Sequence, residues 1–227
     1  MPLPLFAPET KASLVSYPPS SDTPQPRWMV IIAILAVGGL YTALPQSLSV
    51  GPRWLFPLIV AGLLVPSVLT HRSGNQAWNN LIGYALAGIL TLFLVWSLVL
   101  LVVALPAHKE APVTLLRSAV ALWITNVLVF ALWYWRLDAG GPYRRDDRPG
   151  HESGSFLFPQ MLLTDEKWKL WSPNFIDYLF LAFNTSTAFS PTDVPVLSRW
   201  AKVLTMAQAS ISLTAVAVLA ARAVNIL

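Results

Sequence analysis

The stretch Leu90-Thr91-Leu92-Phe93-Leu94-Val95 lies inside the longest apolar segment of the chain, which runs from about Leu81 to Leu105. This segment contains no charged residue, and Pro106 follows it directly. A helix needs about 20 apolar residues to cross the hydrocarbon core of a bilayer, which is about 30 Å thick. The segment therefore predicts a transmembrane helix and an integral membrane protein.

Four further apolar segments are also predicted to be transmembrane helices. They run from about Trp28 to Leu44, Trp54 to Leu69, Val113 to Trp135 and Trp200 to Ile226. The first contains Gly38-Gly39, and such small residues allow a neighbouring helix to approach closely. The fold predicted for residues 27–227 is thus all-α, with five transmembrane helices in one membrane domain.

The composition agrees with this prediction. Hydrophobic residues make up 55% of the 227 positions and charged residues only 11%, whereas soluble domains carry about 25% charged residues. The formal net charge is +4, which is typical of membrane proteins with Lys and Arg in their cytoplasmic loops. No basic run is dense enough to predict nucleic-acid binding.

Two polar regions interrupt the apolar pattern. Residues 1–26 are rich in Pro and Ser and predict a disordered tail, without the features of a signal peptide. Residues 137–174 predict a partly ordered extramembrane loop. This loop contains Arg144-Arg145-Asp146-Asp147-Arg148, which we interpret as a solvated surface.

Residues 175–197 predict a re-entrant helix and loop. Phe175 to Phe189 is short for a crossing, Asn184 to Thr187 makes its second half polar, and Pro191 stops a helix. We expect a short amphipathic helix followed by a polar turn at membrane depth. Such a turn is stable only where protein or a water-filled cavity satisfies its backbone.

Polar residues within the predicted spans form two features. Asn126 lies near the middle of its span, where a buried amide is expected to bond a neighbouring helix. Thr205, Gln208 and Ser212 fall at helical spacing on one face of the last span. This face is predicted either to pack against protein or to line a pathway.

From about Leu115 to Leu227 the sequence resembles the pore region of tetrameric potassium-type channels with two helices per pore unit. Phe183, Thr185, Thr187 and Asp193 fall in register with the pore helix and the Thr-rich filter of that family. The segment is also similar to a group of uncharacterised bacterial multi-pass membrane proteins that share Thr-Ala-Phe-Ser-Pro-Thr-Asp. The resemblance implies a homotetrameric pore for monovalent cations in a bacterial cytoplasmic (inner) membrane.

The filter itself departs from the family pattern. Ser190, Pro191 and Thr192 stand where the family has Gly-Tyr-Gly, and those glycines permit backbone angles that other residues adopt only at a cost. We therefore expect a non-standard filter with cation-selective side chains. The residues predicted near the pathway are Thr185, Thr187, Ser190, Thr192, Asp193, Gln208 and Ser212.

Two alternatives and a conflict over orientation remain. A non-conducting scaffold would bind a partner protein through residues 137–174, and a small transporter would need inverted repeats, which the sequence does not display. The channel topology puts the Arg-rich loop outside, against the positive-inside rule. If residues 175–189 crossed the membrane, six spans would place that loop inside.

The sequence predicts neither an enzyme nor a cofactor. It contains no cysteine, and His71, His108 and His151 lie far apart without a second ligand at metal-binding spacing. No phosphate-binding loop or nucleophile motif is present in the sequence. Asp177 is expected to bind a helix N-terminus.

Overall fold

The computed structural model describes residues 27–52, 54–72, 76–107, 111–146, 154–169, 171–191 and 193–224. The predicted tail (residues 1–26), His108, His151 and Thr192 lie outside these residues. Across the described ranges the chain is helical and forms no strand, apart from an isolated antiparallel bridge between Phe156 and Val196. The all-α prediction is confirmed.

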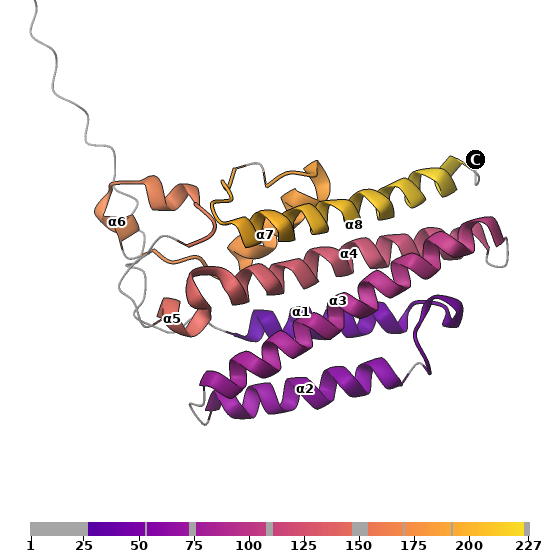
Figure 1. Ribbon diagram of the computed structural model, residues 1–227, viewed down its shortest axis with the longest axis horizontal. Helices are drawn as coiled ribbons and strands as arrows, with labels where there is room; N and C mark the ends of the chain where they lie inside the picture. The colour runs from indigo at the N-terminus through magenta and orange to yellow at the C-terminus, as the bar shows by residue number, and fades with distance from the viewer. Residues whose placement is uncertain are drawn as a thin grey trace, which may run out of the picture.

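Six helices form the body of the molecule, and most of the long ones run along its longest axis, while one crosses them obliquely (Figure 1). They are α1 (Trp28–Thr42), α2 (Leu55–Arg72), α3 (Gln76–Ala107), α4 (Pro112–Leu137), α7 (Phe175–Ala188) and α8 (Arg199–Val224). The connections contain η1 (Gln46–Leu48), η2 (Asp138–Gly140), α5 (Pro142–Asp146), η3 (Pro159–Leu162) and α6 (Glu166–Lys169). We call the end of the bundle that holds residues 138–174 the loop end.

Three helical segments among the described residues are long and apolar enough to cross a membrane. They are Gln76–Leu105, Pro112–Gly140 and Arg199–Ala221. The other two predicted spans also form apolar helices, but α1 and the Leu55–Ser67 part of α2 are shorter. At 1.5 Å per residue, α1 is only about 22 Å long, less than the hydrocarbon thickness.

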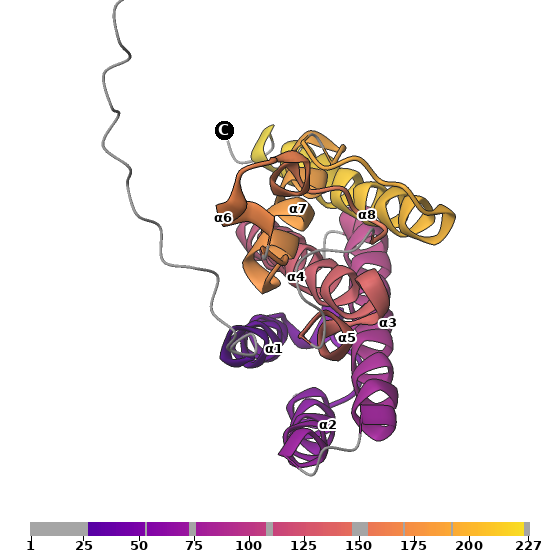
Figure 2. The same cartoon turned by 90° about the vertical axis from the view of Figure 1, so that its left-hand side faces the viewer.

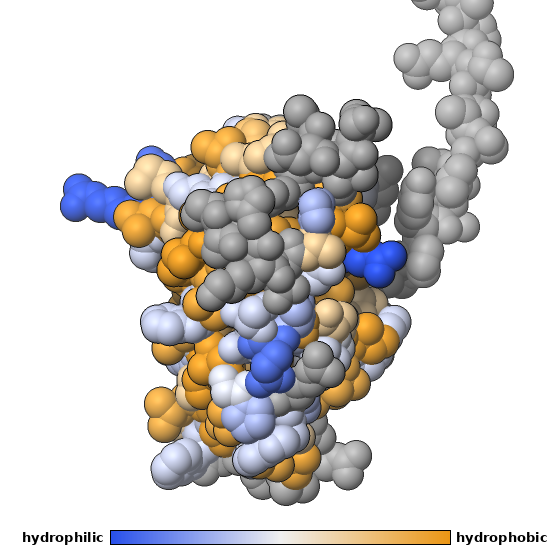
Figure 3. Space-filling view, turned by 90° about the vertical axis from the view of Figure 1, so that its right-hand side faces the viewer, coloured by the Kyte–Doolittle hydropathy of each residue, from blue (hydrophilic) through white to orange (hydrophobic). Residues whose placement is uncertain are grey.

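Large apolar side chains cover much of the outer surface. On α3, for example, Leu92 is 70% exposed, and Trp96, Val99 and Val103 are exposed beside it. Hydrophobic side chains also cover much of the outline of the bundle seen in Figure 3. In water such a surface is a liability, whereas lipid solvates it without cost.

Helix α4 lies at the centre of the bundle (Figure 2) and contacts α1, α3, α7 and α8. Its buried residues occur on every side of the helix, as Val129, Phe130, Ala131 and Tyr134 demonstrate. A helix that is buried all round needs partners on all its faces. This central place lets α4 present polar side chains to both α7 and α8.

Gly38 and Gly39 allow a neighbouring helix to approach closely, but α1 and α2 do not use this possibility. A Cβ atom on either glycine would meet no heavy atom within 4 Å. Instead, an open cavity of about 310 Å³ lies between α1 and α2 at this level. The rings of Tyr41 and Phe56 stack at a centroid distance of 4.0 Å, and this bulky contact joins the two helices.

Helix α7 extends along only part of α4, and the chain then returns through residues 189–191 and 193–198, which we call the return segment. Both ends of this excursion contact the same loop: the Tyr178 ring lies 6.3 Å from that of Phe156, and the Leu157 amide donates to the Pro195 carbonyl (3.0 Å). Helix α8 therefore also begins at the loop end. The six-span alternative requires α7 to carry the chain across the bundle. In this path α7 does not do so.

Helix α7 continues through the polar stretch from Asn184 to Thr187 and ends at Ala188, so the expected turn can only follow this stretch. The Thr185 hydroxyl donates to the Leu181 carbonyl (2.8 Å), and the Thr187 hydroxyl donates to the Phe183 carbonyl (2.7 Å). These bonds satisfy the threonines within the helix. The helix ends at Phe189, whose φ of 55° is left-handed.

Candidate functional site

A set of hydrogen-bonded polar side chains joins α4, α7 and α8, and we call it the polar seam. It consists of Trp123, Asn126 and Tyr134 on α4, Ser186 on α7, and Gln208 and Ser212 on α8. All of these except Trp123 are fully buried. Because buried polar groups are costly unless bonded, the seam fixes how the three helices fit together.

Gln208 is the most highly connected member of the polar seam. Its amide nitrogen donates to the Ala182 carbonyl (2.7 Å) and to the Ser186 hydroxyl (2.8 Å). Its amide oxygen accepts a hydrogen bond from the Tyr134 hydroxyl. One side chain of α8 therefore bonds both α4 and α7.

One turn further along α8, Ser212 makes the second connection. Its hydroxyl donates to the Ser186 carbonyl (2.5 Å) and accepts from the Trp123 indole nitrogen (3.0 Å). The same indole also approaches the Ser186 carbonyl (3.4 Å). Gln208 and Ser212 are four residues apart, so both point to the same face of α8.

Asn126 completes the polar seam and confirms the predicted amide bond between helices. Its amide nitrogen donates to the Ser186 hydroxyl (3.3 Å) and to the Gln208 carbonyl (3.2 Å). Its amide oxygen is buried without a hydrogen-bond partner among the described residues. The seam therefore keeps one acceptor available within the membrane part of the protein.

The structure divides the seven predicted pathway residues into groups. Gln208 and Ser212 lie in the polar seam, and Thr185 is buried and bonded to its own helix. Thr187, Ser190 and Asp193 are exposed on the surface of the protomer. Thr192 lies outside the described residues.

The backbone around the Thr-rich stretch is not arranged as a ring of carbonyl groups for an ion. Residues 184–188 are helical, so their carbonyls point along the axis of α7. The Ser186 carbonyl accepts from both Ser212 and Trp123.

A second buried polar set lies at the loop end, and the sequence did not predict it. The carboxylate of Asp138 is fully buried and accepts from the Ser155 amide (2.5 Å) and from the Tyr178 hydroxyl (2.7 Å). Arg145, only 5% exposed, donates to the carbonyls of Asp138 (2.7 Å) and Trp135 (2.8 Å). We call Asp138, Arg145, Ser155 and Tyr178 the loop anchor.

The loop anchor corrects the interpretation of the charged run as a solvated surface at one position, Arg145. Arg144 is exposed, as that interpretation predicts, and Asp147 and Arg148 lie outside the described residues. Arg145 points inward and lies over the Tyr178 ring at 5.1 Å. Burial raises the pKa of Tyr178 well above its ordinary value, so its hydroxyl remains a donor to Asp138. Gly154 leaves room for this carboxylate, because a Cβ atom there would lie 2.5 Å from the Asp138 Oδ1 atom.

The N-terminus of α7 begins with a capping box that confirms the predicted role of Asp177. The Asn174 side chain accepts from the Ile176 amide (2.8 Å), and the Asp177 carboxylate accepts from the Asn174 amide (2.7 Å). Burial raises the pKa of Asp177, and the hydrogen bond from the Asn174 amide opposes this shift. The cap fixes where α7 enters the bundle.

Replacing Asn174 with alanine is expected to lower the free energy of unfolding by about 1 kcal/mol, because an N-cap acceptor is lost. Thermal unfolding in detergent measures the change. Serine caps helices as well as asparagine does, so Asn174→Ser is expected to unfold near the wild-type temperature. Equal losses from both substitutions would contradict the assigned cap.

Comparison with known proteins gives no match for this chain among family models, curated proteins or solved structures. Three features of the molecule bear on its function: the partial excursion of α7, the polar seam behind it, and the exposed polar residues that follow it.

Proposed function

We propose that the protein is a multi-pass membrane protein with five transmembrane helices, in which α7 and the return segment form a re-entrant pore loop. The observation that carries this proposal is the order of the last elements. A long helix (α4) is followed by a short helix that enters from the loop end, a return to that end, and a second long helix (α8). Pore-loop channels, which the sequence resembles, have this order.

The exposed polar residues support a pathway between subunits. Thr187, Ser190 and Asp193 lie on the outer surface of the protomer. In a membrane, polar and charged side chains face protein or water rather than lipid. Rings of carboxylate groups select cations, so Asp193 is the proposed selective group for monovalent cations.

The outward face of α8 supports assembly into an oligomer. Ala207, Ser210 and Ala217 are exposed along this face, and small residues allow another membrane helix to pack closely. One pore loop per chain needs several chains around a pathway. By analogy with pore-loop channels, we propose a homotetramer.

The distribution of charge supports entry of the loop from the cytoplasmic side of a bacterial inner membrane. Arg27, Arg136, Arg144 and Arg145 lie at or next to the loop end. The positive-inside rule places this end in the cytoplasm. The proposed pore loop is therefore inverted relative to potassium-type channels.

Substituting Asp193 with asparagine is expected to lower cation conductance several-fold in a reconstituted bilayer, because a ring of charge is removed. Glu166→Gln removes the same charge from an exposed loop position and is expected to leave conductance unchanged. The mass of the detergent-solubilised complex tests the oligomer. A monomer, or wild-type protein without current under either gradient direction, would contradict the pore.

A non-conducting scaffold is the second candidate, and one observation favours it. Leu162 is 65% exposed and Leu163 46% exposed on the loop between the spans, outside the helices that face lipid. Exposed apolar side chains next to acidic residues form a surface that suits a partner protein. Substituting both leucines with serine would then abolish partner binding. Neither the wild-type protein nor this variant would conduct ions.

A further inference from the structure

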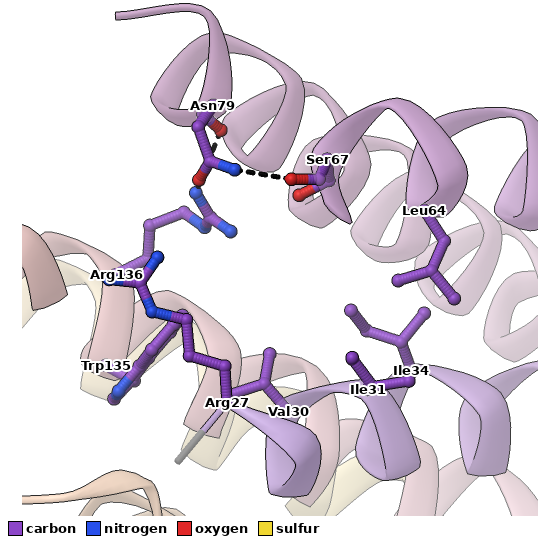
Figure 4. A pocket seen from close by; sticks show the side chains of 9 residues that line it. All are labelled: Arg27, Val30, Ile31, Ile34, Leu64, Ser67, Asn79, Trp135 and Arg136. Atoms are coloured by element: carbon purple, nitrogen blue, oxygen red, sulfur yellow. Dashed lines mark hydrogen bonds between the residues drawn. The ribbon is translucent and has the colours of Figure 1, made fainter. Parts of the chain in front are cut away.

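A cavity with two arginines opens between α1, α2, α3 and α4 near the loop end (Figure 4). Its volume is about 80 Å³. Arg27 and Arg136 both point toward it, and Ser67, Asn79 and Trp135 complete its polar and aromatic lining. Among the described residues that line it, none is acidic.

Arg136 is held in this cavity by α3. Its guanidinium donates to the Asn79 carbonyl (3.2 Å) and lies against the backbone at Gly83, where a Cβ atom would come within 1.8 Å of Arg136 Cζ. The side chain of Arg136 is only 8% exposed. A buried charge is costly unless an opposite charge compensates it, so an anion in the cavity would stabilise this arrangement.

Arg27 brings a second positive charge to the same place. It is the N-cap residue of α1, and its guanidinium lies 3.9 Å from the centre of the Tyr143 ring. The N-terminus of α1 adds the positive end of a helix dipole. Two guanidinium groups and a helix N-terminus are a strong combination for binding a phosphate group.

An apolar groove lies next to the arginine cavity. Leu64 lines both the arginine cavity and the larger cavity of about 310 Å³ between α1 and α2. Gly38 and Gly39 line this second cavity, together with Leu35, Val60 and Val65. The opening is therefore cationic at the loop end and apolar toward the middle of the bundle.

We propose that this composite groove binds one anionic phospholipid, with its phosphate between Arg27 and Arg136 and an acyl chain along Gly38 and Gly39. Charge complementarity selects the headgroup, and the apolar lining of the groove selects a lipid over free phosphate. Basic pockets between membrane helices on the cytoplasmic side bind anionic headgroups in this way. The lipid would fill the space between α1 and α2 that their side chains leave open.

The test is native mass spectrometry of the full-length protein, titrated with phosphatidylglycerol and with phosphatidylcholine of the same chain length. Phosphatidylglycerol is expected to bind at least tenfold more tightly. Arg27→Gln is expected to weaken its binding about fivefold, since each basic residue contributes about 1 kcal/mol. Arg136→Gln tests the buried partner, and Arg27→Gln keeps the test decisive should Arg136→Gln fail to fold.

Two controls separate the parts of the site. Arg144→Gln removes an exposed arginine at the same end and is expected to leave binding unchanged. Gly39→Leu fills the apolar groove and is expected to weaken binding of the lipid but not of glycerol phosphate. Equal affinity for both lipids, equal loss with Arg144→Gln, or full competition by inorganic phosphate alone would overturn the proposal.

Discussion

Replacing Gln208 with leucine is expected to lower the free energy of unfolding by about 3 kcal/mol. Leucine fills a similar volume but leaves the Tyr134 hydroxyl without its acceptor. It also removes one of the two hydrogen bonds that the Ser186 hydroxyl accepts, and the bond from Asn126 remains. Each buried polar group without a partner costs about 1–3 kcal/mol. The effect is large because one side chain bonds two other helices.

Reversible unfolding of the purified protein in mixed detergent micelles measures this change. Ser210→Ala is the matched control, because Ser210 lies on the exposed face of α8 and donates to the Met206 carbonyl of its own helix (2.9 Å). Its stability is expected to stay within about 0.5 kcal/mol of the wild type. A Gln208→Leu protein as stable as Ser210→Ala would show that the polar seam does not hold the helices together.

A double-mutant cycle measures the coupling energy between Tyr134 and Gln208. Tyr134→Phe removes the hydroxyl that donates to Gln208, so Gln208→Leu then leaves one polar group fewer unpaired. The double variant is expected to be about 1 kcal/mol more stable than the sum of the single losses predicts. Strict additivity would mean that Tyr134 and Gln208 do not interact.

The polar seam is the part of the site that sequence patterns predict best. Gln208 and Ser212 repeat at helical spacing in an apolar helix, and Asn126 lies alone in the middle of another. A polar side chain is costly in lipid, so its helix turns that face toward protein. The predicted face of α8 and the bond from Asn126 follow from this cost alone.

The end of α7 was not predictable from composition. Asn184 to Thr187 has the polar character of a turn, yet it stays helical because the threonine hydroxyls bond carbonyls one turn back. The open space at Gly38 and Gly39 was also missed. Small residues permit a close approach, but the aromatic contact between Tyr41 and Phe56 determines where α1 and α2 meet.

The loop anchor depends on contacts between residues that are distant in sequence. Asp138 meets Ser155 over a separation of 17 residues and Tyr178 over 40. No local pattern distinguishes Arg145 from its exposed neighbour Arg144. Only the fold of the loop against α4 and α7 decides which of the two arginines is buried.

Replacing Asp138 with alanine is expected to have the largest effect, a loss of about 4 kcal/mol in the free energy of unfolding. The substitution leaves the Ser155 amide and the Tyr178 hydroxyl unbonded in a buried site. Each buried polar group without a partner costs about 1–3 kcal/mol. The bond from Arg145 to the Asp138 carbonyl belongs to the backbone and remains.

The damage is expected to begin at the loop, because the anchor joins residues 154–178 to the end of α4. Trp171 lies against Phe158, with ring centroids 5.8 Å apart. The part of the tryptophan fluorescence that Trp171→Phe removes therefore reports loss of the loop packing before the helices unfold. Glu166→Ala is the control, since Glu166 is an exposed loop carboxylate, and it is expected to change neither signal. If Asp138→Ala leaves the fluorescence and the protease resistance of the loop unchanged, Asp138 does not anchor the loop. If both are lost while helical content persists, the loop folds against α4 as a separate step, and the entry of α7 into the bundle depends on it.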